Sequence, residues 1–244
     1  MFVTLVYHLI DRTIDAKVAI AEAAFEAQLR YLREQNYTIL SLAQAMAILN
    51  SEQEAPTRSV LLTFDDGYAN NLYVALPLLQ AYGMTATQFV ISAYVGQTNR
   101  WNPRASYDVN HMTWDELRQW QESGCAIGGH SHEHFWMTRL NRQELQAAVN
   151  VNKRLLEEHL ALPVQAFSYP YGAYNQQVED VVKESYELAF AVDPQRWDTP
   201  VDRFAIPRLS VQPKWRIEDF TTRLEKLCAS AAAPSHTAKQ TAKG

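Results

Sequence analysis

The chain has 244 residues, 47% of them hydrophobic and 20% charged, and a formal net charge of −5. This length and composition predict one globular domain and exclude a disordered or fibrous protein. The acidic balance and the lack of a Lys/Arg cluster argue against a nucleic-acid partner. There is no run of about 18 apolar residues, so no membrane span is expected. The start, MFVTLVYHLIDRT, lacks a signal-peptide pattern, so we expect a cytoplasmic protein unless a leader was removed.

Segments typical of strands and helices alternate along the chain. Strands are expected at residues 2–8, 59–64, 86–91, 125–129, 164–169, 188–192 and 204–209. Helices are expected around residues 25–32, 72–82, 113–120, 141–160, 176–183 and 217–227, the third opened by a capping box of Thr113 and Glu116. This alternation predicts an α/β fold with a mainly parallel sheet, an irregular (β/α) barrel of about seven strands. A Rossmann sheet is disfavoured because no G-x-G-x-x-G follows the first strand.

The C-terminus differs in composition from the rest of the chain. Residues 229–244 read ASAAAPSHTAKQTAKG, a small, polar and poorly patterned stretch. Such a segment buries too little apolar surface to fold, so we expect a disordered tail there. Residues 1–228 are then expected to form the single folded domain.

In a barrel of this kind, polar groups at the carboxyl ends of strands form the active site. One expected strand ends in Asp65-Asp66, followed by Gly67. Two adjacent carboxylates are costly to desolvate, and Asp-Asp-Gly is also a plausible surface turn. If the pair is functional, its diverging side chains allow one to bind a metal and the other to face a reacting water.

A second strand end carries three of the seven histidines within five residues, in the segment HSHEH that follows Gly128-Gly129. Neutral imidazole is a leading ligand for zinc and related ions. His130 and His134 can share an ion across one helical turn, and His130 and His132 can do so from one face of a strand. The alternative is a polar surface loop that happens to be rich in histidine.

Two weaker signals come from other strand ends. In Tyr169-Pro170-Tyr171-Gly172, the proline and glycine favour a tight turn whose backbone N–H groups can bind an oxyanion. His8 ends the first expected strand, although a lone histidine there is more often structural than catalytic.

Taken together and in order, these segments resemble the polysaccharide deacetylase family (the NodB homology domain, carbohydrate esterase family 4) over about Val3 to Val211. TFDDG is similar to the family's first motif, which implies that Asp65 is the catalytic base and Asp66 a metal ligand. GGHSHEH is similar to the second motif, which implies His130 and His134 as ligands and leaves His132 without that role. YPYG is similar to the end of the third motif, which places Tyr171 where a backbone N–H helps to bind the oxyanion.

Two family features are missing at their usual places. The third-motif arginine that holds the catalytic Asp is replaced by Ser168, and the only late histidine is His236. Both departures are similar to a branch with circularly permuted motifs that includes poly-N-acetylglucosamine deacetylases. That branch carries its last-motif histidine at the front, which implies His8 as general acid. It also has a Pro-Arg near the last strand, so we expect Arg208 to pair with Asp65 in place of the missing arginine.

The resemblance implies a metal-dependent hydrolase that removes acetyl groups from an N-acetylated glycan or oligosaccharide. Zinc is the expected ion, and a carboxylate with two histidines also accepts cobalt, nickel or iron. Aromatic residues near the motifs are candidates for sugar contacts or for the core: Trp101, Trp136, Tyr169, Tyr171 and Trp197. Two alternatives stay open, namely an amidohydrolase acting on a small amide or formamide, and a glycan-binding module with a decayed site.

Overall fold

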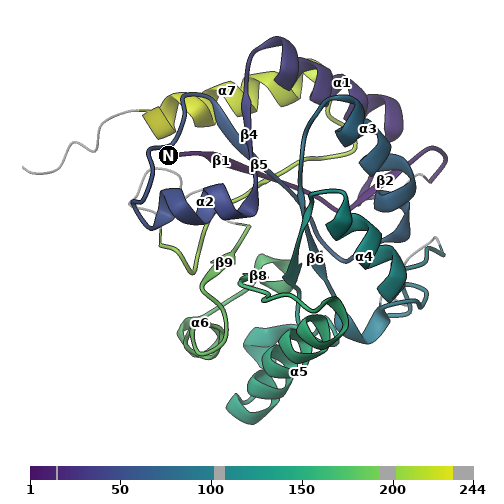
Figure 1. Cartoon of the computed structure of the whole chain (residues 1–244), viewed down its shortest axis with the longest axis vertical. Coiled ribbons are helices and arrows are strands. Elements are labelled where there is room, and N and C mark those ends of the chain that lie inside the picture. Colours follow the sequence, from purple (N-terminus) through teal and green to yellow (C-terminus); the bar gives the residue numbers. More distant parts are fainter. Residues whose placement is uncertain (15, 102–107, 193–201, 233–244) are drawn as a thin grey trace, which may run out of the picture.

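The computed structural model describes residues 1–14, 16–101, 108–192 and 202–232. Its centre is a curled, eight-stranded parallel sheet with the strand order β10-β1-β5-β6-β7-β8-β9 and with β4 also paired to β5 (Figure 1). The strands are β1 (Val3–Tyr7), β4 (Thr38–Leu40), β5 (Ser59–Phe64), β6 (Thr87–Val90), β7 (Ala126–Gly129), β8 (Ala166–Ser168), β9 (Leu188–Phe190) and β10 (Leu209–Ser210). A second, two-stranded sheet pairs β2 (Leu9–Asp11) with β3 (Ala19–Ala21). The α/β architecture predicted from the alternating pattern is confirmed.

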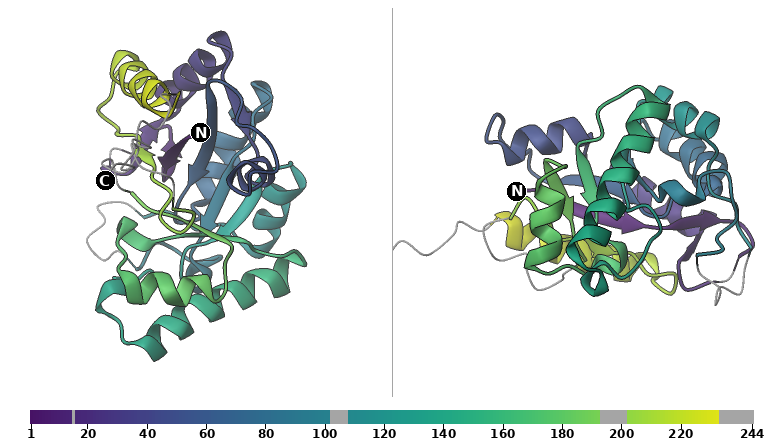
Figure 2. Two further views of the ribbon diagram at one scale, coloured as in Figure 1. Left: turned by 90° about the vertical axis from the view of Figure 1, so that its left-hand side faces the viewer. Right: turned by 90° about the horizontal axis from the view of Figure 1, so that it is seen from below.

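Helices surround the curled sheet, and all but α2 pack on its outside. They are α1 (Glu22–Glu34), α2 (Leu42–Leu49), α3 (Leu76–Ala81), α4 (Trp114–Glu122), α5 (Arg142–Leu160), α6 (Gln176–Lys183) and α7 (Ile217–Ala232). Helix α7 lies beside α1, and α6 lies beside α5 (Figure 2). The predicted capping box of Thr113 and Glu116 opens α4 as expected. Among the described residues, no helix combines the length and apolar character that a membrane span requires.

The curled sheet separates two apolar clusters. On β5, Val60, Leu62 and Phe64 pack outward against the helices, whereas Leu61 packs inward. This alternation follows from the two-residue period of a strand. It also points Thr63 and the following Asp65 toward the inside, at the end of the sheet where the strands finish. Helix α2 packs against the inner cluster near the start of β1, so the opposite end of the sheet is left for the polar groups.

The last expected strand differs most from the prediction. The sequence pattern indicated a strand over residues 204–209, but β10 comprises only Leu209–Ser210, and Ile206 forms an isolated parallel bridge with Phe190 of β9. Pro207 has no N–H and cannot continue a ladder of hydrogen bonds. The segment therefore crosses from β9 to β1 and brings the two edges of the sheet together, with Arg208 between them.

Several other helices and strands differ from the prediction in their bounds or were not predicted. The helix expected over residues 72–82 begins as a π-helical turn, η1 (Asn71–Ala75), before α3. Helix α7 runs to Ala232, past the boundary expected at residue 229, and the rest of the expected tail lies outside the described residues. Strands β2, β3 and β4 were not predicted, because three residues are too few for a reliable period. Helix α2 was also not predicted.

Candidate metal centre and active site

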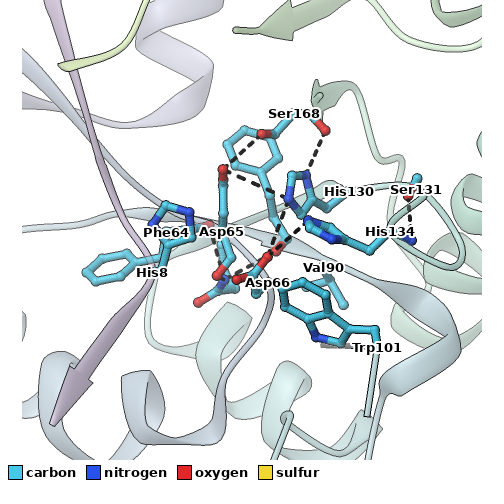
Figure 3. Close-up of polar contacts among 12 residues, drawn as sticks. His8, Phe64, Asp65, Asp66, Val90, Trp101, His130, Ser131, His134 and Ser168 are labelled. Carbon is cyan, nitrogen blue, oxygen red and sulfur yellow. Dashed lines mark hydrogen bonds and ion pairs between the residues drawn. The ribbon is translucent and has the colours of Figure 1, made fainter. Parts of the chain in front are cut away.

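Asp66, His130 and His134 converge at the carboxyl ends of β5 and β7. The Nε2 atoms of both histidines stand 3.5 Å from Asp66 Oδ1, and all three side chains are buried (Figure 3). Two ligands of one tetrahedral ion at about 2.1 Å stand about 3.4 Å apart. Asp66 Oδ1 has no hydrogen-bond partner among the described residues, which is costly for a buried carboxylate unless a cation binds it. The three residues therefore fit a divalent metal ion.

The histidine loop presents its ligands without a helix or a strand. His130 directly follows β7, and its Nδ1 donates to the Ser168 carbonyl at 2.7 Å, which leaves Nε2 free to bind an ion. The backbone then turns through Ser131 and His134, whose φ angles are 61° and 60°. The Ser131 hydroxyl accepts from the His134 N–H at 3.0 Å and closes this turn. Neither spacing considered from the sequence, a helical turn or a strand face, is the one that forms.

His132 lies in the same loop but turns away from the ligands. Its Nδ1 is 2.9 Å from the Ser92 hydroxyl, and its N–H donates to the Ala148 carbonyl. The residue thus fastens the loop to neighbouring elements. This placement agrees with the family pattern, in which the middle histidine is not a ligand.

Asp65 forms a buried ion pair with Arg208. The guanidinium donates to both carboxylate oxygens, from Nη1 at 2.8 Å and from Nη2 at 2.7 Å. The Ser168 hydroxyl donates to Asp65 at 3.2 Å and accepts from Arg208 at 2.8 Å. Further donations from Arg208 reach the Thr63 hydroxyl and the Ala191 carbonyl, both at 3.3 Å. The pairing expected from the Pro-Arg motif is therefore present, with Ser168 linking the two charges.

Burial and neighbouring charges shift the pKa values of the carboxylates and histidines of the site. Burial tends to raise the pKa of Asp65, but Arg208 and the nearby imidazoles outweigh it, so the pKa lies below the usual range. The pKa of Asp66 is also lowered despite burial, chiefly by the neighbouring imidazoles of His130 and His134. Burial lowers the pKa of His134 to about 3, which keeps that imidazole neutral, the form that binds metals. Asp65 is the main cause that raises the pKa of His130 against its burial, so a proton competes for that nitrogen at acidic pH.

His8 and Tyr171 flank this centre. His8 follows β1 and lies beside Asp65, on the side away from His130 and His134 (Figure 3). Tyr171 has a φ of 60° in the turn η4 (Pro170–Gly172), and its ring centroid is 4.6 Å from that of His134. Both residues predicted from the sequence are thus next to the candidate ligands or the candidate base.

The aromatic candidates divide between surface and core. Trp136 stacks on Tyr171 with centroids 4.2 Å apart, and both side chains remain exposed, at 42% and 46%. The Trp101 ring is 4.2 Å from that of His134. Tyr169 is fully buried and its hydroxyl donates to a backbone carbonyl, so it belongs to the core. Trp197 and His236 lie outside the described residues.

Two buried amides near the site were not predicted. Asn71 donates to the His8 carbonyl at 2.7 Å and to Gln88 Oε1 at 3.0 Å. Gln88 in turn donates to the carbonyls of Phe64 and Asp65, at 3.1 and 3.2 Å. The pair therefore fixes the end of β1 relative to the end of β5. The available signal was a glutamine inside the apolar run TQFVI, since a buried amide requires partners.

The family model for polysaccharide deacetylases matches residues 52–187, which include Asp65, Asp66, His130, His134 and Tyr171. The chain belongs to the polysaccharide deacetylase family. This deacetylase is 27% identical over 224 residues to YxkH of Bacillus subtilis (strain 168), a protein named as a polysaccharide deacetylase, and the match covers 91% of this chain and 76% of the relative.

Two further likenesses concern poly-N-acetylglucosamine enzymes and the fold. The deacetylase is 23% identical over 203 residues to the poly-beta-1,6-N-acetyl-D-glucosamine N-deacetylase of Staphylococcus aureus (strain MRSA252), covering 79% of this chain and 68% of that protein. Its fold is similar to that of IcaB from Ammonifex degensii, with a TM-score of 0.78, 24% identity and coverage of 95% and 97% of the two chains. Membership of the polysaccharide deacetylase family, together with the cluster of Asp66, His130 and His134, identifies a metal-dependent hydrolase that acts on C–N bonds other than peptide bonds.

Proposed function

We propose that this deacetylase removes acetyl groups from N-acetylglucosamine units of a glycan and that zinc is its metal. The observation that carries the proposal is the ion pair of Asp65 and Arg208 next to the cluster of Asp66, His130 and His134. This arrangement supplies a carboxylate held beside three potential ligands. A carboxylate with two imidazoles suits zinc, and cobalt, nickel or iron fit the same donors.

Each candidate residue has a task in amide hydrolysis. A bound divalent ion polarises an acyl oxygen and lowers the pKa of a neighbouring water. Asp65 accepts a proton from the attacking water as general base, and Arg208 keeps Asp65 ionised and oriented. The Tyr171 N–H donates to the oxyanion that develops on the acyl oxygen when water adds to the acyl carbon. His8 donates a proton to the nitrogen as the C–N bond breaks, and acetate and a free amine result.

The exposed aromatic pair favours a glycan over a small amide. Trp136 and Tyr171 stack next to His134 while keeping large parts of their rings exposed. Flat aromatic faces suit the apolar C–H faces of sugar rings, and an exposed pair extends contact beyond the reacting group. The name of the Staphylococcus aureus relative makes a poly-N-acetylglucosamine chain the first substrate to test.

The test is acetate release by purified protein after removal of metal with a chelator and after return of zinc or cobalt. N-acetylglucosamine oligomers are compared with small cyclic and linear amides, and Asp65→Asn serves as the control. We expect chelator-sensitive release from the oligomers that zinc restores and that Asp65→Asn lacks. Release from small amides alone would replace the glycan by the amidohydrolase alternative. Tight glycan binding without metal or release would favour the decayed binding module.

A further inference from the structure

His111 is a buried histidine that the proposed chemistry does not use. Its side chain is 2% exposed, and both ring nitrogens point to residues of the active site. Nε2 accepts from the Trp101 indole N–H at 3.1 Å, and Nδ1 is 2.8 Å from the Asp66 carbonyl oxygen. Since an indole nitrogen only donates, Nδ1 must carry the proton and donate to Asp66. The ring is therefore a neutral imidazole in one tautomer.

One end of this imidazole holds the backbone of a candidate ligand. Asp66 has a φ of 73°, a left-handed conformation that is unfavourable for a residue other than glycine. The Asp66 carbonyl points toward His111. The next residues of both segments are also hydrogen-bonded, because the Met112 N–H donates to the Gly67 carbonyl at 2.9 Å. The His111 donation thus compensates a strained peptide at the position that aims the Asp66 carboxylate.

The other end places an indole on a second ligand. Trp101 contacts the His134 ring at a centroid distance of 4.2 Å (Figure 3). The only polar atom of its side chain, Nε1, donates to His111. His134 Nδ1 lacks a hydrogen-bond partner among the described residues, so packing against Trp101 and Tyr171 orients this ring. His111 thereby touches one ligand through a hydrogen bond and the second through Trp101.

We propose that His111 is a positioning residue, which aims the Asp66 carboxylate through its Nδ1–H and seats Trp101 against His134 through Nε2. The expected effect of His111 on metal affinity depends only on the cluster of Asp66, His130 and His134. Its expected effect on substrate binding rests on the proposed function. Burial lowers the pKa of His111, which favours the neutral ring that the two hydrogen bonds already require.

Two amide substitutions of His111 test its two hydrogen bonds separately, because each keeps one bond and removes the other. His111→Asn retains a donor near the Nδ1 position, whereas His111→Gln retains an acceptor near Nε2, and His111→Ala has neither. Trp101→Phe keeps the ring but loses the indole donor. His159→Asn is the control for the same substitution elsewhere, because His159 is exposed and stacks on Trp114 between the outer helices α4 and α5. Zinc affinity is measured by chelator competition, and the cobalt-loaded proteins are compared by visible absorption.

We expect His111→Ala and His111→Gln to weaken zinc binding by about 10- to 100-fold. His111→Asn keeps the donor to Asp66, so it should weaken zinc binding less than His111→Ala. It should also raise KM for the oligomer, as Trp101→Phe should, because Trp101 is a candidate sugar contact. His159→Asn should change neither. Equal zinc loss in His111→Asn and His111→Ala, or no loss in either, would overturn the inference. If zinc affinity follows the expected order but the wild type releases no acetate, the positioning role stands and the proposed function fails.

Discussion

The ion pair of Asp65 and Arg208 gives the sharpest test of how the site works. Replacing Arg208 by Met keeps much of the buried side-chain volume but removes the charge and its donations to Asp65, Ser168, Thr63 and Ala191. Removing one partner of a buried pair destabilises a protein by about 3–5 kcal/mol, because the other charge stays buried and uncompensated. Arg208 is 1% exposed and Asp65 is 3% exposed, so solvent does not screen the loss.

The same substitution changes the pKa of the candidate base. In the wild type, Arg208 is the largest influence that lowers the pKa of Asp65 against burial. Without it, burial dominates, and the pKa rises toward or above the usual value of about 4. A base works only when deprotonated, so the acidic limb of kcat/KM moves to higher pH. Activity should therefore fall most at the acidic end of the profile.

The assay combines pH profiles of kcat/KM with denaturant unfolding for Arg208→Met, Asp65→Asn and the double variant. Removing both charges should destabilise less than the sum of the two single losses, because no charge is left unpaired. Arg208→Lys is the control that keeps a charge but loses the two-pronged geometry, and its acidic limb should move less. An Arg208→Met protein with wild-type stability, activity and pH profile would refute the reasoning.

Three further predictions concern packing, substrate length and acid stability. Gly129→Ala should destabilise the protein by about 1–3 kcal/mol in denaturant unfolding, because its Cβ would lie 2.2 Å from the Tyr186 hydroxyl; an unchanged midpoint would contradict this. Trp136→Ala should raise KM for an oligomer more than for single N-acetylglucosamine, because the ring it exposes beside Tyr171 is the expected sugar platform; equal changes would argue against it. Because the folded-state pKa of Asp65 is lowered, its stabilising contribution is present above about pH 5 and is lost as pH falls through about 4 toward the folded pKa. Urea unfolding across that range should show a larger loss for the wild type than for Asp65→Asn.

Local signals allowed much of the fold to be predicted. The apolar run SVLLTF was predicted to be a buried strand and is β5 with the same bounds, and the expected helix over residues 176–183 is α6. These segments were predictable because a strand or helix buries one face, so its apolar residues recur at a fixed spacing along the sequence. The boundary near Pro207 was misjudged because the apolar pattern continued where hydrogen bonding could not.

The candidate ligands were also predictable, although their geometry was not. Asp66, His130 and His134 were found from two short motifs that resemble one family, whose model matches this chain. The backbone turn that brings them together depends on left-handed residues and on the Ser131 hydroxyl, which spacing alone does not reveal.

By itself, the sequence determined which short segments carry the candidate ligands and which longer apolar runs become strands, since both depend on neighbouring residues. The pairing of Arg208 with Asp65 was expected from the family resemblance. Only the tertiary structure revealed that Ser168 links these two charges and that His111 reaches Asp66 across 45 positions, because the curled parallel sheet gathers the ends of distant strands and their loops. A buried charge or imidazole needs a hydrogen-bond partner, and the fold decides which group lies close enough to be that partner. The residues next to it in the sequence do not identify this group.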